Sequence, residues 1–323
     1  MPVALITGVT GQDGTYLAEF LHGRRYQVHG LVRPGQQDDG EFDRLLISRL
    51  VHQHEAGITD EKGVLRVIAA VRPDECYHLA ACTFAGAEDH PAMLDVNVLG
   101  TQHVLHAVRQ HAPSCRVFVA GSSEIFGAAD VYPQTEETPR RPQTLYGVSK
   151  AAAYDLTRYY RDVRAVHASC GILYNHESPR RGRQFVTRKI TSAVACIKEG
   201  LQSELLLGNL EDQRDWGHAR DYVRAMWLML QQSSPDDYVI ATGELHSVRE
   251  FVQRAFERAG LEWRQYVRTD PQFYRPSRQV PLAGCARKAR ETLGWTTELD
   301  FTQLVSEMVD EDLAKTDKHC IGR

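Results

Sequence analysis

A glycine-rich loop near the N-terminus limits the folds available to this chain more than any other sequence feature. Gly8, Gly11 and Gly14 follow a short apolar run, Val3–Thr7, and precede residues 15–21, which have helical spacing. Glycines let the backbone turn sharply and approach a pyrophosphate, and a helix N-terminus favours its negative charge. A glycine pattern alone is weak evidence, but its place between a strand and a helix predicts a dinucleotide-binding fold.

Apolar strands alternate with helices through the first half of the chain. The alternation predicts further strands over residues 26–32, 76–79 and 116–120, and helices over residues 59–71, 91–111 and 146–161. Strands joined by helical crossovers pair in parallel, and such crossovers are right-handed. We therefore expect an α/β fold built on a doubly wound parallel sheet of the Rossmann type.

The second half of the chain has a mixed pattern. Helical spacing recurs over residues 185–198, 221–232, 248–259 and 301–314, and a loop with two prolines covers residues 271–278. We expect residues 1–172 to form an NADP-binding Rossmann domain that carries the catalytic residues. Residues 173–323 should form a smaller C-terminal α/β lobe that binds the substrate and is partly interleaved with the first domain.

The composition argues against several classes of partner. The chain has 323 residues, enough for one large domain or two medium ones, and its formal net charge of -4 gives no support to nucleic-acid binding. No apolar run reaches the length of a membrane span. The 7 cysteines are odd in number and form no CxxC pair, which is typical of reduced thiols in a cytoplasmic protein. Without CxxC or HExxH motifs we expect no metal site.

Tyr146 and Lys150 lie in the predicted helix over residues 146–161. Their spacing places both side chains on one face, where they can meet at one substrate atom. A tyrosine normally loses its proton at about pH 10, and a neighbouring ammonium and the cofactor charge favour the phenolate. The phenolate can then take a proton from a hydroxyl group as hydride leaves the carbon. The pair therefore predicts hydride-transfer chemistry.

Ser122 and Glu124 add a hydroxyl and a carboxylate just after the predicted strand 116–120. A simple reductase or epimerase has no need of that carboxylate, but an elimination does. Once a sugar carbon becomes a ketone, the proton on the next carbon is acidic, and Glu124 can move it to a departing hydroxyl. A glutamate that only caps a turn or pairs with a lysine would look the same in sequence.

Arg33 follows the second predicted strand, at the position that selects between NAD and NADP. An acidic residue there would bond the ribose hydroxyls of NAD, whereas an arginine accommodates the extra phosphate of NADP. Arg33 therefore favours NADP and makes NAD the less expected cofactor. An arginine that stacks on adenine or faces solvent remains the alternative.

These motifs resemble those of the extended short-chain dehydrogenase/reductase superfamily. Over nearly the whole chain they resemble its GDP-mannose 4,6-dehydratase family. The similarity is carried by residues 4–20, 122–127, 146–150, 173–182, 185–190, 214–217 and 221–227. The Asn-His-Glu-Ser-Pro block and the Arg-Asp-Trp-Gly block are far more specific than the generic superfamily motifs.

The resemblance implies an NADP-dependent lyase that converts GDP-mannose to GDP-4-keto-6-deoxymannose by internal hydride transfer and loss of water. The implied catalytic residues are Ser122, Glu124, Tyr146 and Lys150. The implied cofactor contacts are Gly8, Thr10, Gly11, Gln12, Asp13, Arg33, Leu79, Ala80, Ala81, Tyr146, Lys150, His176 and Arg181. The implied GDP-sugar contacts are Thr83, Asn175, Val186, Lys189, Arg214 and Arg275. A homo-oligomer, either a dimer or a tetramer, is also implied.

Several positions depart from the family pattern. Arg33 is followed by Pro34 where a second arginine is usual, which bears on both NADP preference and tetramer formation. Gly57 replaces the acid that meets adenine, and Cys82 replaces a glutamine. Arg278 stands where a glutamate usually meets the nucleotide ribose. These changes surround the ligands rather than the catalytic set.

Three functions remain open at the level of the sequence. The first is the dehydratase reaction, which Glu124 favours. The second is a dehydratase, 4-dehydrogenase or epimerase acting on a related GDP-sugar such as a GDP-heptose, which Gly57 and Arg278 keep open. The third is a nucleotide-binding regulatory protein that has lost turnover. The intact set of Ser122, Tyr146 and Lys150 with Glu124 argues against it, because a retired site has no need of all four.

Overall fold

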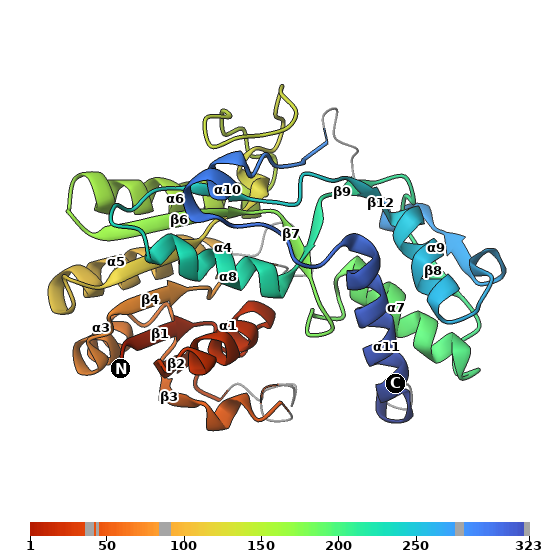
Figure 1. Ribbon diagram of the computed structural model, residues 1–323, viewed down its shortest axis with the longest axis horizontal. Coiled ribbons are helices and arrows are strands. Elements are labelled where there is room, and N and C mark those ends of the chain that lie inside the picture. Colours follow the sequence, from red (N-terminus) through yellow and green to blue (C-terminus); the bar gives the residue numbers. More distant parts are fainter. Residues whose placement is uncertain (36–41, 43–44, 84–91, 275–280, 320–323) are drawn as a thin grey trace.

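The computed structural model describes residues 1–35, 42, 45–83, 92–274 and 281–319. Their main sheet has seven parallel strands in the order β11-β6-β5-β4-β1-β2-β3 (Figure 1). The strands are β1 Val3–Thr7, β2 Gln27–Val32, β3 Val51–Glu55, β4 Glu75–His78, β5 Arg116–Ala120, β6 His167–Leu173 and β11 Tyr238–Ile240. The order reverses direction beside β1, so the predicted doubly wound parallel sheet is confirmed.

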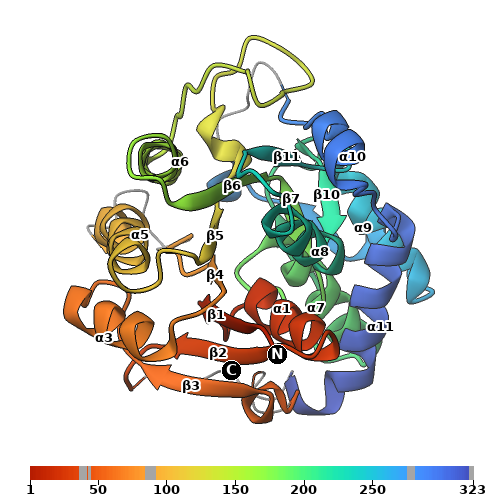
Figure 2. The same ribbon diagram turned by 60° about the vertical axis from the view of Figure 1, so that its left-hand side comes forward.

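Helices cover both faces of this sheet. One face carries α3 (Glu61–Val71), α5 (Gly100–His111) and α6 (Leu145–Asp162), and the other carries α1 (Gln12–Gly23), α8 (Ala219–Leu230) and α10 (Arg287–Leu293). Figure 2 shows the two helical layers on either side of the sheet. Both faces are covered, which explains why the central strands read as continuous apolar runs rather than as alternating ones.

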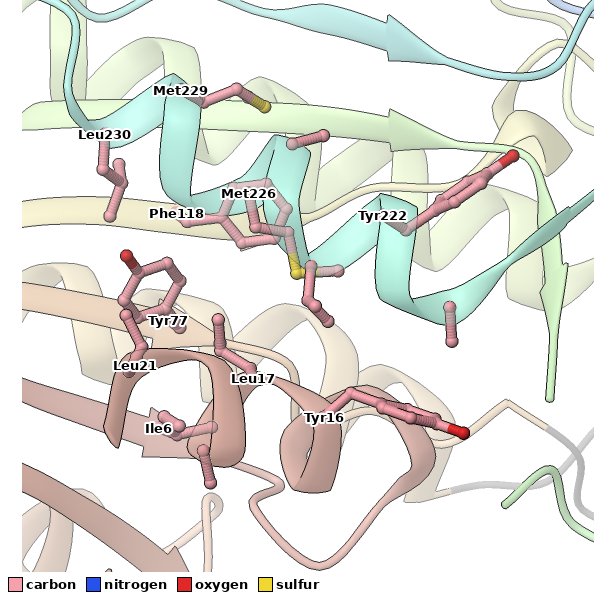
Figure 3. Close-up of a cluster of buried hydrophobic side chains, with 14 of the residues drawn as sticks. Ile6, Tyr16, Leu17, Leu21, Tyr77, Phe118, Tyr222, Met226, Met229 and Leu230 are labelled. Atoms are coloured by element: carbon pink, nitrogen blue, oxygen red, sulfur yellow. The ribbon is translucent and has the colours of Figure 1, made fainter. Parts of the chain in front are cut away.

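The core between α1, α8 and the sheet joins segments that are distant in sequence. Leu17 of α1 and Met226 of α8 are fully buried over Tyr77 and Phe118, which project from β4 and β5 (Figure 3). Burying one such side chain stabilises the fold by about 1.5–3 kcal/mol. Helix α8, strand β11 and helix α10 therefore belong to the sheet's core although they come from the second half of the chain.

A second cluster of buried apolar residues forms the C-terminal lobe, at the right of Figure 1. Three helices surround it: α7 (Val186–Lys198), α9 (Val248–Arg258) and α11 (Phe301–His319). The remaining strands form two-stranded pairs: β7 Asn175–Glu177 with β10 Trp216–His218, β9 Gln213–Arg214 with β12 His246–Ser247, and β8 Leu205–Leu207 with β13 Val267–Thr269. The division at residue 172 stays a prediction.

Three sequence predictions differ from the structure. Strands β3, β6 and β11 of the main sheet were not predicted. The sequence of β3, Val-His-Gln-His-Glu, is polar, and only its first residue is buried. The helix predicted over residues 91–111 contains a π-helical turn, Asp95–Leu99, between the short α4 (Ala92–Leu94) and α5. Cys196 is disulfide-bonded, so the prediction that every cysteine is reduced is wrong there. Within the described ranges, no helix is both long and apolar enough to cross a membrane.

Candidate active site

The carboxyl ends of β1, β4 and β5 lie side by side and define the site. Thr7 is in register with His78, and His78 is in register with Val119, so the three strands end at nearly the same level. The glycine loop, residues 79–83 and residues 121–125 follow these ends. In open α/β sheets, ligands bind in the crevice at this edge, next to the point where the strand order reverses.

Two glycines of the loop, Gly8 and Gly14, leave no room for a Cβ atom. Gly8 has a φ of +73°, and a Cβ on it would lie 2.8 Å from the Ala80 nitrogen. A Cβ on Gly14 would lie 2.3 Å from the Gly8 oxygen. Gly11 precedes α1 and provides no side-chain cap, so the first N–H groups of that helix are left to meet an anion. These residues fit the diphosphate of a dinucleotide.

A set of hydrogen bonds joins the start of α1 to strand β7. The His176 Nε2 and the Asp13 Oδ2 are 2.8 Å apart, and the Gln12 amide donates to the His176 carbonyl oxygen. The Ser178 hydroxyl donates to Gln12 Oε1 over 2.8 Å. The His176 ring also stacks on Tyr222, with ring centroids 4.4 Å apart. These bonds hold together implied cofactor contacts from both halves of the chain, namely Gln12 and Asp13 with His176.

The opposite charges of Asp13 and His176 shift the pKa values of both side chains. Burial alone would raise the pKa of Asp13, but the charge and hydrogen bond of His176 outweigh it, so that pKa is lowered. Burial alone would lower the pKa of His176, yet Asp13 raises it above the ordinary value. Arg181 lies near Asp13 and adds to the lowering there. The pair therefore carries opposite charges over a widened pH range.

A short 3-10 turn, Ser123–Ile125, places Glu124 beside the catalytic helix. Ser122 caps this turn, because its hydroxyl oxygen accepts a 3.2 Å hydrogen bond from the Glu124 N–H. Helix α6 begins after Thr144, whose side chain caps it by accepting from Gly147 N. A Cβ on Gly147 would lie 2.6 Å from the backbone carbonyl oxygen of Glu124, so the glycine lets the helix touch the turn. This contact brings Tyr146 next to Glu124.

The four implied catalytic residues share one site. The Tyr146 phenol lies near Ser122, Glu124 and Arg181, all of which act on its pKa. The Lys150 Nζ lies 5.9 Å from the centre of the Tyr146 ring and donates a 2.7 Å hydrogen bond to the Ala120 oxygen. Ser122 and Lys150 are buried, whereas Glu124 and Tyr146 are partly exposed.

Burial shifts the pKa values of Tyr146 and Lys150 in opposite directions. Burial is the largest effect on Tyr146 and, with Glu124, raises its pKa to about 12, although Ser122 and Arg181 act in the opposite direction. Burial also lowers the pKa of Lys150 to about 8. In the protein alone, desolvation of the phenolate therefore keeps the phenol protonated. The prediction that an ammonium and the cofactor charge together favour the phenolate concerns the site with its cofactor and stays a prediction.

The remaining predicted ligand contacts come from several elements. Leu79, Ala80 and Ala81 directly follow β4, and Arg33 directly follows β2. The implied sugar contacts come mainly from the C-terminal lobe: Asn175 on β7, Val186 and Lys189 on α7, and Arg214 on β9. Thr83 is exposed, and Arg275 and Arg278 lie outside the described residues. The roles of these residues stay predictions.

Lys189 and Arg214 are each presented by a rigid element. The Lys189 Nζ lies 4.2 Å from the centre of the Phe273 ring. The Arg214 guanidinium donates to the Gln213 oxygen and lies 3.8 Å from the Asp212 carboxylate. Arg214 is partly exposed. Their predicted role as contacts of an anionic ligand stays a prediction.

Sequence reasoning missed a group of buried polar residues behind the catalytic helix. Asn97 binds both backbone groups of Cys82 and donates to the Ser149 hydroxyl, while His78 lies between Thr7 and Thr101. The available signal was the presence of polar side chains at buried positions of a predicted helix and strand. The π-helical turn that makes Asn97 face α6 has no recognised sequence signature.

Three histidines meet on the outer strands of the sheet. His52 and His54, an HxH pair that the sequence reading overlooked, lie on β3 beside His29 of β2. The rings of His52 and His54 have centroids 5.0 and 5.1 Å from that of His29. The His29 Nδ1 and His54 Nε2 atoms are 2.8 Å apart. In the part of the chain that the structure describes, no group of His, Cys, Asp or Glu is arranged to hold a metal ion.

The sheet order and the strand-end site define an extended short-chain dehydrogenase/reductase. Solved structures share this fold over nearly the whole chain. A dTDP-glucose 4,6-dehydratase from Bacillus anthracis in complex with NAD has a TM-score of 0.83 and 20% identity, with 98% of each chain covered. A putative epimerase from Burkholderia cenocepacia has a TM-score of 0.86 and 23% identity, covering 97% of this chain and 98% of that one.

Sequence comparisons narrow the class to one family. The family model described as GDP-mannose 4,6 dehydratase matches residues 5–308, so this chain belongs to that family. GDP-mannose 4,6 dehydratase 2 of Arabidopsis thaliana is 47% identical over 333 residues, covering 98% of this chain and 88% of the plant protein. The GDP-mannose 4,6-dehydratase of Yersinia enterocolitica is 40% identical, covering 99% and 96% of the two chains. The predicted family is therefore confirmed.

Proposed function

We propose that this protein converts GDP-mannose to GDP-4-keto-6-deoxymannose with loss of water. The observation that carries the proposal is the contact between the Glu124 turn and the Tyr146 helix. The start of the helix packs against the Glu124 backbone, and the charge of Glu124 acts on the pKa of the Tyr146 phenol, which supports a shared role for the two side chains. An oxidation needs one proton acceptor, and an elimination needs a second one. This site has both, and membership of the dehydratase family supports the same reaction.

Each residue has a separate task in the proposed reaction. Tyr146 takes the proton of the O4 hydroxyl as C4 is oxidised, and Ser122 donates a hydrogen bond to the resulting carbonyl oxygen. Glu124 removes the C5 proton, which the C4 carbonyl has made acidic, and gives a proton to the C6 hydroxyl as it leaves as water. A nicotinamide held here would supply the hydride acceptor for C4 and the hydride donor for C6. The proton that Tyr146 took from O4 balances the one that C5 then takes up.

Lys150 has a different part in this proposal. Its ammonium is buried beside the Tyr146 ring and donates to the Ala120 oxygen. An ammonium there favours the phenolate at the moment the proton is taken, in opposition to the burial that keeps the free phenol protonated. Its N–H groups also suit the hydroxyls of a nicotinamide ribose.

We propose NADP rather than NAD as the cofactor. Arg33 directly follows β2, is exposed, and lies next to the end of β3. A guanidinium suits a phosphate, whereas NAD requires an acid at this place for its ribose hydroxyls. A GDP-sugar substrate agrees with the cations Lys189 and Arg214. We also propose that the protein is cytoplasmic.

A product-mass experiment tests the reaction. Purified protein is incubated with GDP-mannose and NADP, and the sugar nucleotide and NADPH are followed together. Loss of one water without net NADPH supports the dehydratase. Net NADPH without water loss would indicate a dehydrogenase, and unchanged mass with altered stereochemistry would indicate an epimerase. The same measurement with a GDP-heptose tests the related substrate, which the departures at Gly57 and Arg278 leave open.

We propose that the chain forms a homo-oligomer through helix α6. Val148, Tyr159 and Val163 have exposed fractions of 45%, 40% and 64%, and their spacing repeats along one helical stripe. Exposed apolar stripes of this kind mark protein contacts. Val163→Asp should reduce the mass measured by light scattering to that of a smaller assembly. Leu201→Asp, at an exposed leucine of the other lobe, is the matched control and should leave the mass unchanged.

A further inference from the structure

A chain of buried hydrogen bonds runs from the first strand of the sheet to the catalytic helix. His78 Nδ1 lies 2.8 Å from the Thr7 hydroxyl, and His78 Nε2 lies 3.1 Å from the Thr101 hydroxyl. Thr101 donates to the Asn97 backbone oxygen over 2.7 Å. The Asn97 amide donates to Ser149 Oγ over 2.9 Å. All five side chains are buried, so their polar groups depend on one another for partners.

The donors in this chain can be assigned from the acceptors. The Asn97 oxygen can only accept, so the Thr101 hydrogen is used there, and the Thr101 oxygen must accept from His78 Nε2–H. His78 Nδ1 then has a lone pair and accepts from the Thr7 hydroxyl. The Thr7 oxygen in turn accepts from the Ala80 N–H over 3.2 Å. One neutral tautomer of His78 satisfies every group.

The Thr101 hydroxyl lies at the π-helical turn. It donates to the carbonyl four residues earlier, and the Gly100 N–H bonds the Asp95 oxygen five residues earlier. A side chain that competes for a backbone acceptor bends or widens a helix. By donating to the Thr101 oxygen, His78 fixes the orientation of that hydroxyl. The imidazole therefore acts on the turn as well as on strand β1.

The π-helical turn aims the Asn97 amide at two predicted parts of the active site. Asn97 Oδ1 accepts from the Cys82 N–H over 2.8 Å, and its Nδ2 donates to the Cys82 oxygen over 3.0 Å. These two hydrogen bonds hold Cys82, in the segment that runs from Ala80 to Thr83, against the π-helical turn. The second Nδ2 hydrogen goes to Ser149, whose hydroxyl donates to the Tyr146 backbone oxygen over 2.8 Å.

We propose that His78 is a positioning residue for this reaction. It acts through the π-helical turn on residues 79–83, which follow strand β4, and on helix α6. The proposal rests on the proposed function, since it concerns how that site is held. The His78 side chain bonds Thr7 at the end of strand β1 and Thr101 on helix α5, and it acts on Tyr146 only through other residues. Burial and the charge of Lys150 lower the pKa of His78 to about 3, so the same tautomer persists through the neutral pH range.

Three variants test the proposal against a matched control. His78→Leu removes the donor and the acceptor, His78→Gln keeps an N–H near the Nε2 position, and Thr101→Val removes the next bond of the chain. The control is Thr157→Val, because Thr157 is also a buried helical threonine whose hydroxyl donates to the carbonyl four residues earlier. Turnover, KM for GDP-mannose and amide hydrogen exchange are measured on each folded variant.

We expect His78→Leu and Thr101→Val to lower kcat by about 10–10²-fold with KM little changed, because a small misplacement of reacting groups costs that much. His78→Gln should recover most of the loss. The double variant His78→Leu/Thr101→Val should be no worse than either single one, since both act in one chain. Thr157→Val should keep wild-type kcat.

Hydrogen exchange makes the test independent of the assigned reaction. The Cys82 amide is bonded to Asn97, so its exchange should accelerate in His78→Leu and Thr101→Val but not in Thr157→Val. Unchanged Cys82 exchange in His78→Leu would overturn the proposal even if GDP-mannose proves to be the wrong substrate. Equal loss of kcat in the Gln and Leu variants would overturn it as well, because a space-filling role would not distinguish them from each other.

Discussion

The Asp13 carboxylate lies 2.8 Å from the His176 imidazole and joins the first helix of the chain to a strand of its second half. Both residues belong to the implied cofactor set, and they are far apart in sequence. The contact therefore ties the glycine loop to the segment that carries Arg181. Cofactor affinity and fold stability should both depend on it.

Asp13→Asn should destabilise the protein by about 1–3 kcal/mol, because His176 is left without the negative charge that it faces. The raised pKa of His176 means that its contribution is complete below the ordinary value of 6.5 and is lost as pH rises through the folded pKa. The lowered pKa of Asp13 means that its contribution is lost as pH falls below 3.8. Thermal unfolding of both proteins across pH 4–8 measures the difference, which should be largest between about pH 4 and 6.5.

A difference in Tm that is independent of pH would contradict this account. His176→Gln provides the complementary variant, since it removes the cation and leaves the hydrogen-bonding groups. Its loss of stability should follow the same pH profile, because the two charges act as a pair.

Glu124→Gln should lower turnover by about 10²–10⁴-fold, the usual range for a general acid–base group. The amide has nearly the shape of the carboxylate but cannot take the C5 proton. Titration calorimetry should give the wild-type dissociation constant for NADP, because Glu124 is not among the implied cofactor contacts. Solvent deuterium incorporation at C5 should fall with turnover. Wild-type turnover in this variant would show that Glu124 only supports the turn after Ser122.

Much of the sheet could be predicted from sequence because its central strands are short apolar runs bounded by turn residues. Strands β1, β2 and β5 were predicted to within a residue, and helix α6 to within a residue at each end. Strand β3 was missed because an edge strand has one face near solvent, and its histidines and glutamate hide the period of two.

The candidate site was less predictable than the fold. Motif spacing brought Ser122, Glu124, Tyr146 and Lys150 together, since a strand end and a helix face have known directions. The pKa of Tyr146 could not be predicted in the same way, because burial depends on how the two lobes pack. The network through His78 and Asn97 was also missed. Hydrogen bonds between residues on four different elements have no local sequence pattern.

Lys150→Met should abolish turnover and raise stability. Burial lowers the pKa of Lys150 from 10.5 to about 8, so the folded state pays to keep the ammonium buried at neutral pH. A shift of that size corresponds to about 3 kcal/mol, reduced by the loss of the hydrogen bond to Ala120. Because the folded pKa is depressed, the wild type gains stability as pH rises from about 8 toward 10.5. The advantage of the Met variant in thermal unfolding should therefore be largest below pH 8 and shrink above it.

Asp312→Asn should destabilise the protein and loosen the segment that carries Arg181. Asp312 of α11 pairs with Arg188 of α7, and both side chains are almost completely buried. Breaking a buried pair on one side typically costs about 3–5 kcal/mol, because the other charge stays buried without compensation. The Arg188 Nε also donates to the Arg181 oxygen over 3.2 Å, so movement of Arg188 should displace an implied cofactor contact. Chemical denaturation and NADP titration measure the two effects.

Asp310→Asn is the matched control for this change. Asp310 lies on the same helix and pairs with Arg258, but the two side chains are 48% and 51% exposed. Exposed pairs contribute about 0–1 kcal/mol, so this variant should unfold close to the wild type and bind NADP equally well. If the Asp310 and Asp312 variants lose similar stability, burial does not set the strength of these pairs. If Asp312→Asn is destabilised yet binds NADP normally, the Arg188 contact does not hold the Arg181 segment in place.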